Sequence, residues 1–187
     1  MIEISLHLLD IVQNSIKAGA KNIYINIFED TKQNVLKMTI RDDGCGMSKE
    51  LIKKVADPFA NLNQTRTAGL GLSLLKTSCV ECGGKFEIES EKGIGTTVTA
   101  EYVYDSVDRQ PLGDMAFTVT SLLLCNLDTR FVYAHTFNHK SFEFDSDKYS
   151  AAANKAVRSG EDLNEWLENL LNEKIRDIHK NDEQTQV

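Results

Sequence analysis

Apolar and polar residues recur along the chain at two spacings, which predict helices alternating with strands. Near the N-terminus, Leu8, Ile11, Val12 and Ile16 recur every three or four residues. This spacing is typical of a helix that buries one apolar stripe. Gly19 follows the last apolar residue at the position where a left-handed residue is favoured, so we expect the helix to end there.

The same helix carries a second stripe, which is polar. His7, Asp10, Asn14 and Lys17 also recur at steps of three or four and therefore share one face. A solvated face usually carries long Glu and Lys side chains, whereas this one presents a short carboxylate and an amide one turn apart. The stripe marks a candidate polar site, although for His7 we favour ordinary packing or solvation.

Alternation with a period of two predicts the strands. The expected strands, the first of them short, cover residues 2–5, 21–30, 35–42, 85–91 and 96–104. The second and third strands, and the fourth and fifth, are close enough in sequence to form antiparallel hairpins. Ser48 can cap a short helix that ends before Pro58.

Two pairs of glycines interrupt this pattern at chemically suggestive places. Gly44 and Gly46 directly follow the strand that ends at Asp42, which marks a loop whose backbone must approach another group closely. Gly69 and Gly71 open a predicted helix that runs to about residue 82. Free backbone N–H groups at the positive end of a helix favour phosphate, so the second pair predicts an anion site.

The character of the chain changes after residues 105–110. We therefore predict two parts, residues 1–104 and a C-terminal extension over residues 105–187. In the extension we expect a helix at 111–124 with Pro111 in its first turn, a hairpin of strands 130–137 and 140–145, and an amphipathic helix at 160–179. Whether the extension forms a second domain or packs on the first stays open here.

Composition narrows the classes of partner. The chain of 187 residues has a net charge of −7 and no basic block, so nucleic acid is a poor candidate. The chain begins with no basic-then-apolar signal, and its apolar runs are too short to span a bilayer, so we expect a cytoplasmic protein with no membrane contact. Cys79 and Cys82 have metal-ligand spacing but no second pair, so free thiols are favoured.

Five motifs in order resemble those of the GHKL ATPases, the superfamily of DNA gyrase, the large heat-shock chaperones, sensor histidine kinases and MutL proteins. They are Asp10-xxx-Asn14-xxxx-Gly19-Ala20, Asp42-x-Gly44-x-Gly46, Asp57-Pro58-Phe59, Gly69-Leu70-Gly71-Leu72 and Gly93-x-Gly95-Thr96. Each motif is weak alone, but five in order over residues 4–104 are specific. The extension is closest in character to small stand-alone bacterial ATP-binding proteins of the same superfamily.

The resemblance implies an α/β (α+β) two-layer sandwich of the Bergerat type. A mixed, mostly antiparallel sheet would carry helices on one face, with ATP bound between the helices and a lid. Asn14 would hold Mg²⁺ and Asp42 would accept a hydrogen bond from the adenine amino group. The other residues that the resemblance places around ATP are Gly44, Gly46, Arg66, Gly69, Leu70, Gly71, Leu72 and Thr96 (or Thr97).

The chain departs from the family pattern where catalysis is decided. Asp10 stands where hydrolysing members carry Glu, so it could position a nucleophile for attack on the γ-phosphate or be too short to do so. Thr67 stands where the family often has a glycine, and Arg66 is the only cation of the short lid.

Two functions remain open. The first is a Mg²⁺-dependent ATP-binding enzyme, either a slow ATPase or a kinase that phosphorylates a protein in trans. The second is a non-catalytic module that senses ATP against ADP and docks a partner. The expected partners are ATP, another protein and, as an alternative, a second copy of the chain.

Overall fold

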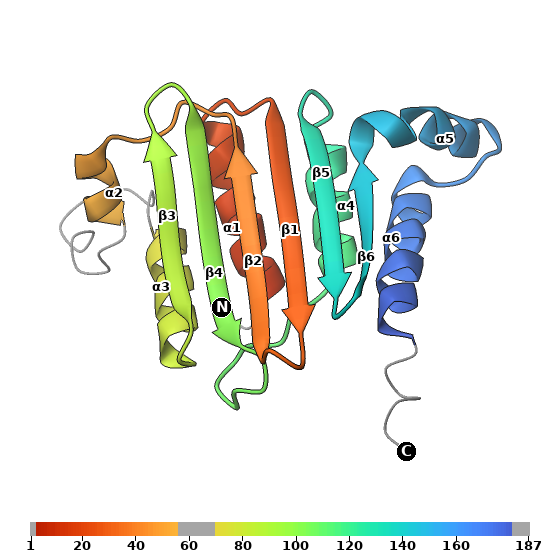
Figure 1. Cartoon of the computed structure of the whole chain (residues 1–187). Coiled ribbons are helices and arrows are strands. Elements are labelled where there is room, and N and C mark those ends of the chain that lie inside the picture. Colours follow the sequence, from red (N-terminus) through yellow and green to blue (C-terminus); the bar gives the residue numbers. More distant parts are fainter. Residues whose placement is uncertain (1–2, 56–69, 181–187) are drawn as a thin grey trace, which may run out of the picture.

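The computed structural model of the protein describes residues 3–55 and 70–180 (Figure 1). Across these residues the chain alternates between helices and strands. The helices are α1 (Ile4–Lys17), α2 (Lys49–Val55), α3 (Leu70–Glu81), α4 (Met115–Cys125), α5 (Ser146–Arg158) and α6 (Leu163–His179). The strands are β1 (Asn22–Asp30), β2 (Val35–Asp42), β3 (Lys85–Glu91), β4 (Gly95–Val103), β5 (Arg130–Phe137) and β6 (Lys140–Asp145).

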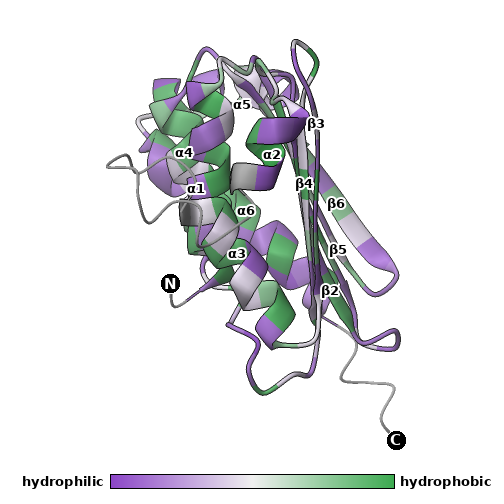
Figure 2. Cartoon of the chain, turned by 90° about the vertical axis from the view of Figure 1, so that its left-hand side faces the viewer, coloured by the Kyte–Doolittle hydropathy of each residue, from purple (hydrophilic) through white to green (hydrophobic). Residues whose placement is uncertain are grey.

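All six of these strands join one sheet, in the order β3-β4-β2-β1-β5-β6. Neighbouring strands are antiparallel except β1 and β5, which are parallel. Viewed along the sheet, the helices lie together on one side of it (Figure 2). The predicted two-layer fold, with a mixed and mostly antiparallel sheet, is therefore confirmed.

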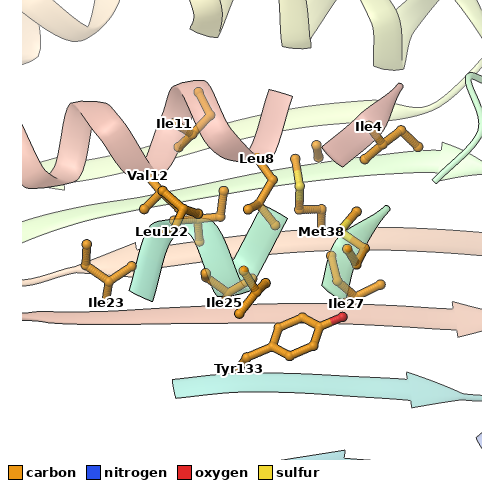
Figure 3. Packing of buried hydrophobic residues seen from close by; sticks show 14 of the residues in the cluster. Ile4, Leu8, Ile11, Val12, Ile23, Ile25, Ile27, Met38, Leu122 and Tyr133 are labelled. Atoms are coloured by element: carbon orange, nitrogen blue, oxygen red, sulfur yellow. The ribbon is translucent and has the colours of Figure 1, made fainter. Parts of the chain in front are cut away.

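The apolar stripe of α1 packs on the middle of this sheet. Ile4, Leu8 and Val12 are fully buried in one apolar cluster that also holds Ile25 and Ile27 of β1 and Met38 of β2 (Figure 3). Each fully buried side chain of this size stabilises the fold by about 1.5–3 kcal/mol relative to an exposed one. The helix that carries the polar stripe is thus held rigidly over the sheet.

Residues after 105 extend the same sheet. β5 pairs with β1 along its whole length, from Asn22 opposite Arg130 to Glu29 opposite Phe137. Val119 of α4 and Leu171 of α6 are fully buried in the same apolar cluster as α1. The core therefore runs without interruption from the first helix to the last.

Two predictions near the ends of helices were wrong, and a hydrogen bond between Ile4 and Pro111 connects them. Ile4 is already helical, so no strand covers the described part of residues 2–5, and Pro111 lies before α4. The Pro111 carbonyl oxygen accepts from the Ile4 N–H at 3.0 Å, which satisfies an N–H that the first turn of α1 leaves free. Asp114 caps α4 instead, accepting from the Phe117 N–H at 2.8 Å.

The helix α5 was not predicted from the sequence, and α6 begins at Leu163, later than the expected residue 160. Asp145 ends β6 and caps α5, accepting from the Asp147 N–H. Gly160 has a φ of +85° and follows the end of α5, so it separates two helices and does not open one. Among residues 3–55 and 70–180, no helix has the length and apolarity to cross a membrane.

Candidate functional site

A cavity opens where β2 ends beneath α1. Its volume is about 280 Å³, and α1, the loop after β2, α2, α3 and β4 all contribute to its wall. The lining is mostly apolar, with a few polar groups from α1 and the strand ends. The lining residues are Ile11, Asn14, Ser15, Ala18, Asp42, Cys45, Gly46, Met47, Leu51, Leu72, Thr96 and Val98.

Asp42 is the buried acid of this cavity. It is 9% exposed, and its two carboxylate oxygens accept from the Ser15 hydroxyl at 2.6 Å and from the Gly44 N–H at 2.9 Å. An ionised carboxylate has about four acceptor positions, so two donors fix its orientation and leave capacity for a third. The group is therefore oriented and still able to bind a donor that enters the cavity.

The neighbouring acid, Asp43, has a different task. Its carboxylate accepts from the Lys21 N–H at 2.7 Å and from the backbone and side chain of Asn22. Burial opposes ionisation, but these hydrogen bonds prevail and lower the pKa of Asp43 below its ordinary value. Since adjacent residues point to opposite sides here, Asp43 ties β2 to the start of β1 while Asp42 faces the cavity.

The glycine loop is held by close backbone contacts. Gly46 has a φ of +62°, and a Cβ on it would overlap the carbonyl oxygen of Glu91. A Cβ on Gly44 would lie 2.9 Å from the Cβ of Ala18 at the end of α1. Both glycines are thus required by neighbouring protein atoms, in addition to any approach by a ligand.

Thr96 lies directly opposite Asp42 in the pairing of β2 with β4. Its hydroxyl is 2.8 Å from that of Ser90, which also bonds to the Met47 N–H and to the Gly95 carbonyl oxygen. This small network fixes the loop on the strand side of the cavity. It holds Thr96 beside the carboxylate without bonding to it.

Asp10 and Gly71 meet where α1 contacts the first turn of α3. A Cβ on Gly71 would lie 3.2 Å from the Cβ of Asp10 and 3.4 Å from its Oδ2. Glycine at this position lets α3 begin directly against the carboxylate. Asn14, one turn further along α1, lines the cavity, so Asp10 and Asn14 follow one edge of it.

The predicted site residues fall into four groups. Asn14, Asp42, Gly46, Leu72 and Thr96 line the cavity, and Asp10, Gly44 and Gly71 contact its walls or border it. Leu70 begins α3. Arg66 and Gly69, together with the 57–59 motif and Thr67, lie outside the described residues.

The sequence analysis missed Ser15, which orients Asp42. The available signal was its spacing: Ser15 follows Ile11 by four residues and Val12 by three, on the apolar stripe of the helix. A serine buried there needs a hydrogen-bond partner. It also missed the apolar wall formed by Met47 and Leu51. The sequence did not predict this wall, because the segment after residue 46 has the pattern of an ordinary loop and a short surface helix.

The cysteine pair does not contribute to this site. Cys79 and Cys82 are buried and free, and burial raises the pKa of Cys79 to about 12. A thiol with such a pKa is not a reactive thiolate at neutral pH. The pair thus packs as two small apolar residues in the core, Cys79 within α3 and Cys82 directly after it.

An apolar slot with an oriented acceptor at its end suits a flat ring that carries an exocyclic amine. Similarity to known proteins shows to which protein family a chain with this cavity belongs. A family model described as histidine kinase-, DNA gyrase B- and HSP90-like ATPase matches residues 2–105. The chain belongs to this ATPase family. The resemblance recognised from five short motifs is therefore confirmed, and the cavity lies within the matched residues.

Two relatives show how much of the chain is shared. The Non-motile and phage-resistance protein of Caulobacter vibrioides is 32% identical over 101 residues, which are 49% of this chain and 12% of that protein. Sensor histidine kinase WalK of Bacillus subtilis is 28% identical over 102 residues, 51% of this chain and 17% of WalK. The chain thus matches only a small part of each.

A solved structure shares the fold. The N-terminal domain of a DNA repair protein superposes with a TM-score of 0.52 at 15% identity, covering 78% of this chain and 52% of that one. This coverage is more than residues 2–105 could supply. The shared architecture therefore includes part of the segment that follows the family match.

Proposed function

We propose that this ATPase-family domain binds ATP, with the adenine ring in the cavity beside Asp42. The observation that carries the proposal is the orientation of the Asp42 carboxylate by Ser15 and Gly44, which leaves acceptor capacity towards the cavity. An acceptor matches the amino group of adenine, whereas guanine would present its carbonyl oxygen there and leave the free acceptor position of Asp42 without a donor from the ligand. A volume of about 280 Å³ suits a base and not a whole nucleotide, so the phosphates would extend outside it.

The phosphates would then pass Asn14 and the start of α3. An amide oxygen and water suffice from the protein side for Mg²⁺, which takes its remaining ligands from phosphate oxygens. The N-terminal turn of α3 offers free backbone N–H groups and a positive helix end. Asn14 is our proposed metal ligand, and Gly71 keeps the approach to this turn open.

Asp10 is our proposed catalytic residue. It lies one turn before Asn14 and beside Gly71, the position from which a carboxylate could orient a water or a hydroxyl for in-line attack on the γ-phosphate. The proposed reaction is slow hydrolysis, or transfer of the phosphoryl group to a partner protein. Transfer is supported by relatives such as WalK, which is by name a sensor histidine kinase.

A nucleotide-sensing module remains the second candidate, and one contact favours it. The first N–H groups of α1 donate to the carbonyl oxygens of Pro111 and Leu112, in the segment that follows the family match. A shift of α1 on exchange of ATP for ADP would therefore reach α4 directly. In this case Asp10 would have no chemical step to perform.

Calorimetric titration of the full chain with Mg²⁺ and ATP, ADP or GTP tests the binding proposal. We expect ATP and ADP to bind and GTP to bind at least tenfold more weakly. Asn14→Ala should reduce the gain in ATP affinity that Mg²⁺ provides, whereas Asn26→Ala, on the exposed part of β1, should not. No binding of ATP, or equal affinity for GTP, would reject the adenine assignment.

Phosphate release and transfer distinguish the two candidate functions. Asp10→Asn is expected to abolish release of phosphate while ATP affinity stays within about threefold of wild type. If wild type binds ATP but neither releases phosphate nor labels a partner, the sensing module is the better description. Cytoplasmic location, a partner protein and self-association stay predictions.

A further inference from the structure

A second cluster of polar side chains is buried on the helix-covered face, at the far ends of β1 and β5. Glu29 of β1, His135 of β5 and His179 of α6 each point one ligand-type atom to a common point, and these atoms all lie within 4.8 Å of one another. Glu29 Oε1 is 2.9 Å from His135 Nε2 and 3.2 Å from His179 Nε2. The cluster joins the final helix to two neighbouring strands.

The remaining ring nitrogens of both histidines are also engaged. His179 Nδ1 lies 2.7 Å from the Ile175 carbonyl oxygen, one turn earlier in α6. His135 Nδ1 lies 2.8 Å from the Tyr133 hydroxyl. A histidine that binds a metal through Nε2 usually donates its Nδ1–H to such a carbonyl or hydroxyl oxygen, which fixes the ring.

The surroundings shield most of this cluster from solvent. Glu29 is 4% exposed and His135 is fully buried, while the His179 ring lies on Phe137 with centroids 4.1 Å apart. Burial opposes ionisation of Glu29, but hydrogen bonds from both histidines prevail and lower its pKa to about 2. The carboxylate is therefore charged, and only the His179 side, 34% exposed, faces solvent.

We propose that Glu29, His135 and His179 form a binding site for one divalent transition-metal ion, which fastens α6 to the sheet. Two imidazole nitrogens and one carboxylate oxygen are a common donor set for Zn²⁺, with arms of about 2.0–2.2 Å. Donors around such an ion lie about 3.4 Å apart, close to the 2.9 and 3.2 Å between Glu29 Oε1 and the two Nε2 atoms. Water would supply a fourth ligand from the open His179 side.

The donor types select the ion. Imidazole nitrogen favours zinc and its neighbours in the transition series, whereas Mg²⁺ and Ca²⁺ prefer sites made only of oxygen atoms. Without metal, the same atoms form the hydrogen-bonded cluster described above. A metal that binds both Nε2 atoms displaces their protons. The proton of His135 moves to its Nδ1, which faces Tyr133. His179 releases its Nε2 proton to solvent and keeps the proton on Nδ1.

The site does not depend on ATP. Along β1 it lies on the order of 20 Å from Asp42, because six residues separate Glu29 from Ile23, the partner of Asp42 in the sheet. Zinc here would hold the end of α6 and leave the nucleotide cavity unchanged. Failure of this proposal would therefore not affect the proposed ATP site, and the reverse is also true.

Addition of ZnSO₄ to the chelator-treated full chain, followed by calorimetry, tests the proposal. We expect one Zn²⁺ per chain and a melting temperature raised by roughly 5–10 °C when Zn²⁺ is 100-fold above its Kd. His179→Ala should abolish this shift. His139→Ala removes an exposed histidine from the nearby β5–β6 turn and should leave the shift unchanged.

Cobalt provides a second readout that does not depend on stability. Co²⁺ bound to wild type should give the intense visible bands of a low-coordinate nitrogen and oxygen site, without a thiolate charge-transfer band. Glu29→Gln should weaken binding of Co²⁺ at least tenfold. No saturable binding, a thermal shift that persists in His179→Ala, or a thiolate band would each overturn the proposal.

Discussion

The two ends of the central strands bury carboxylates in opposite ways. At one end, Asp42 has two protein donors, an empty acceptor position and a cavity of about 280 Å³ beside it. At the other end, Glu29 is bonded to His135 and His179, whose rings pack edge to face, and only the His179 side is partly exposed to solvent. The same sheet thus presents an open acid and a closed one.

This difference shows how a buried acid is recognised as a binding site. Burial alone does not separate the two, since both carboxylates are largely hidden from solvent. Each carboxylate accepts two protein hydrogen bonds, so the separating property is the adjacent volume: Asp42 lines a cavity of about 280 Å³, whereas both partners of Glu29 are imidazole rings. Substitutions should therefore affect ligand affinity at the open end and folding stability at the closed end.

Glu29→Ala is expected to have the largest effect on stability. It removes the only carboxylate that faces His135 and His179 within the described cluster, and leaves the fully buried His135 ring without this acceptor, while the His179 ring remains partly exposed to water. Breaking a buried pair in this way costs about 3–4 kcal/mol. Urea denaturation of chelator-treated protein measures it, and ATP affinity of the folded variant should not change.

The control for this variant is Glu87→Ala, which removes an exposed acid from β3. Its effect should stay within about 0.5 kcal/mol, as for most surface substitutions. Equal effects of the two variants would mean that the closed cluster does not stabilise the fold. A large loss of ATP affinity in Glu29→Ala would mean that the two ends are coupled.

The next largest effect tests how the open end is built. Gly46 and Gly19 both have positive φ, at +62° and +79°, but only at Gly46 would a Cβ overlap another atom. Gly19→Ala should cost about 1 kcal/mol through backbone strain alone. Gly46→Ala should cost about 2–3 kcal/mol, because the loop must also move away from Glu91. Equal losses would show that the contact with Glu91 can relax freely.

The comparison also explains how far the sequence could be interpreted. The apolar stripe of α1 and the alternating strands predict the first layer of the fold, because those periods depend only on which face is buried. The order of the motifs predicts Asn14, Asp42 and Thr96 near one cavity, and the structure brings them together there. Sequence-based prediction therefore succeeds for helices and strands with a regular local spacing, and for site residues that belong to a known order of motifs.

The closed end could not be predicted in this way. Glu29 and His135 are 106 residues apart in the chain, and His179 is 150 residues from Glu29. They meet only because β5 pairs in parallel with β1 and α6 packs against β5 and β6. The start of α4 was misplaced for a similar reason, because Pro111 serves α1 through its carbonyl oxygen. Long-range pairing leaves no local spacing to detect.

Asp42→Asn should affect affinity more than stability. The amide can still accept from Ser15, but it loses one acceptor oxygen and places an NH₂ group near the cavity or the Gly44 N–H. We expect ATP to bind at least tenfold more weakly, a change of about 1.4 kcal/mol, with less discrimination against GTP. Calorimetric titration measures both nucleotides.

The matched control for Asp42→Asn is Asp43→Asn. Its carboxylate holds Lys21 and Asn22 and does not line the cavity, so ATP affinity should stay unchanged while stability falls slightly. If both variants bind ATP like wild type, Asp42 does not recognise the adenine base. If both lose affinity equally, the loop as a whole carries the effect.

The smallest expected effect concerns Asp145, a buried acid whose partner reaches solvent and which is therefore intermediate between the two ends. Its carboxylate accepts from Arg130 at 3.1 and 2.8 Å, and this pairing lowers its pKa from 3.8 to about 2 although burial opposes it. A carboxyl with a lowered pKa stabilises the fold above pH 3.8, and this stabilisation is lost as the pH falls towards 2. Because the Arg130 side chain is 36% exposed, solvent screening limits the contribution to about 1 kcal/mol.

Comparison of wild type with Asp145→Asn isolates this contribution, since asparagine still caps α5. The difference in unfolding free energy should be constant from about pH 5 to 7 and shrink between about pH 4 and 2. A difference that persists unchanged at pH 2 would mean that the charge of Asp145 is not what stabilises this edge. Loss of the difference already above pH 5, as the pH falls, would mean that Arg130 does not lower the pKa of Asp145.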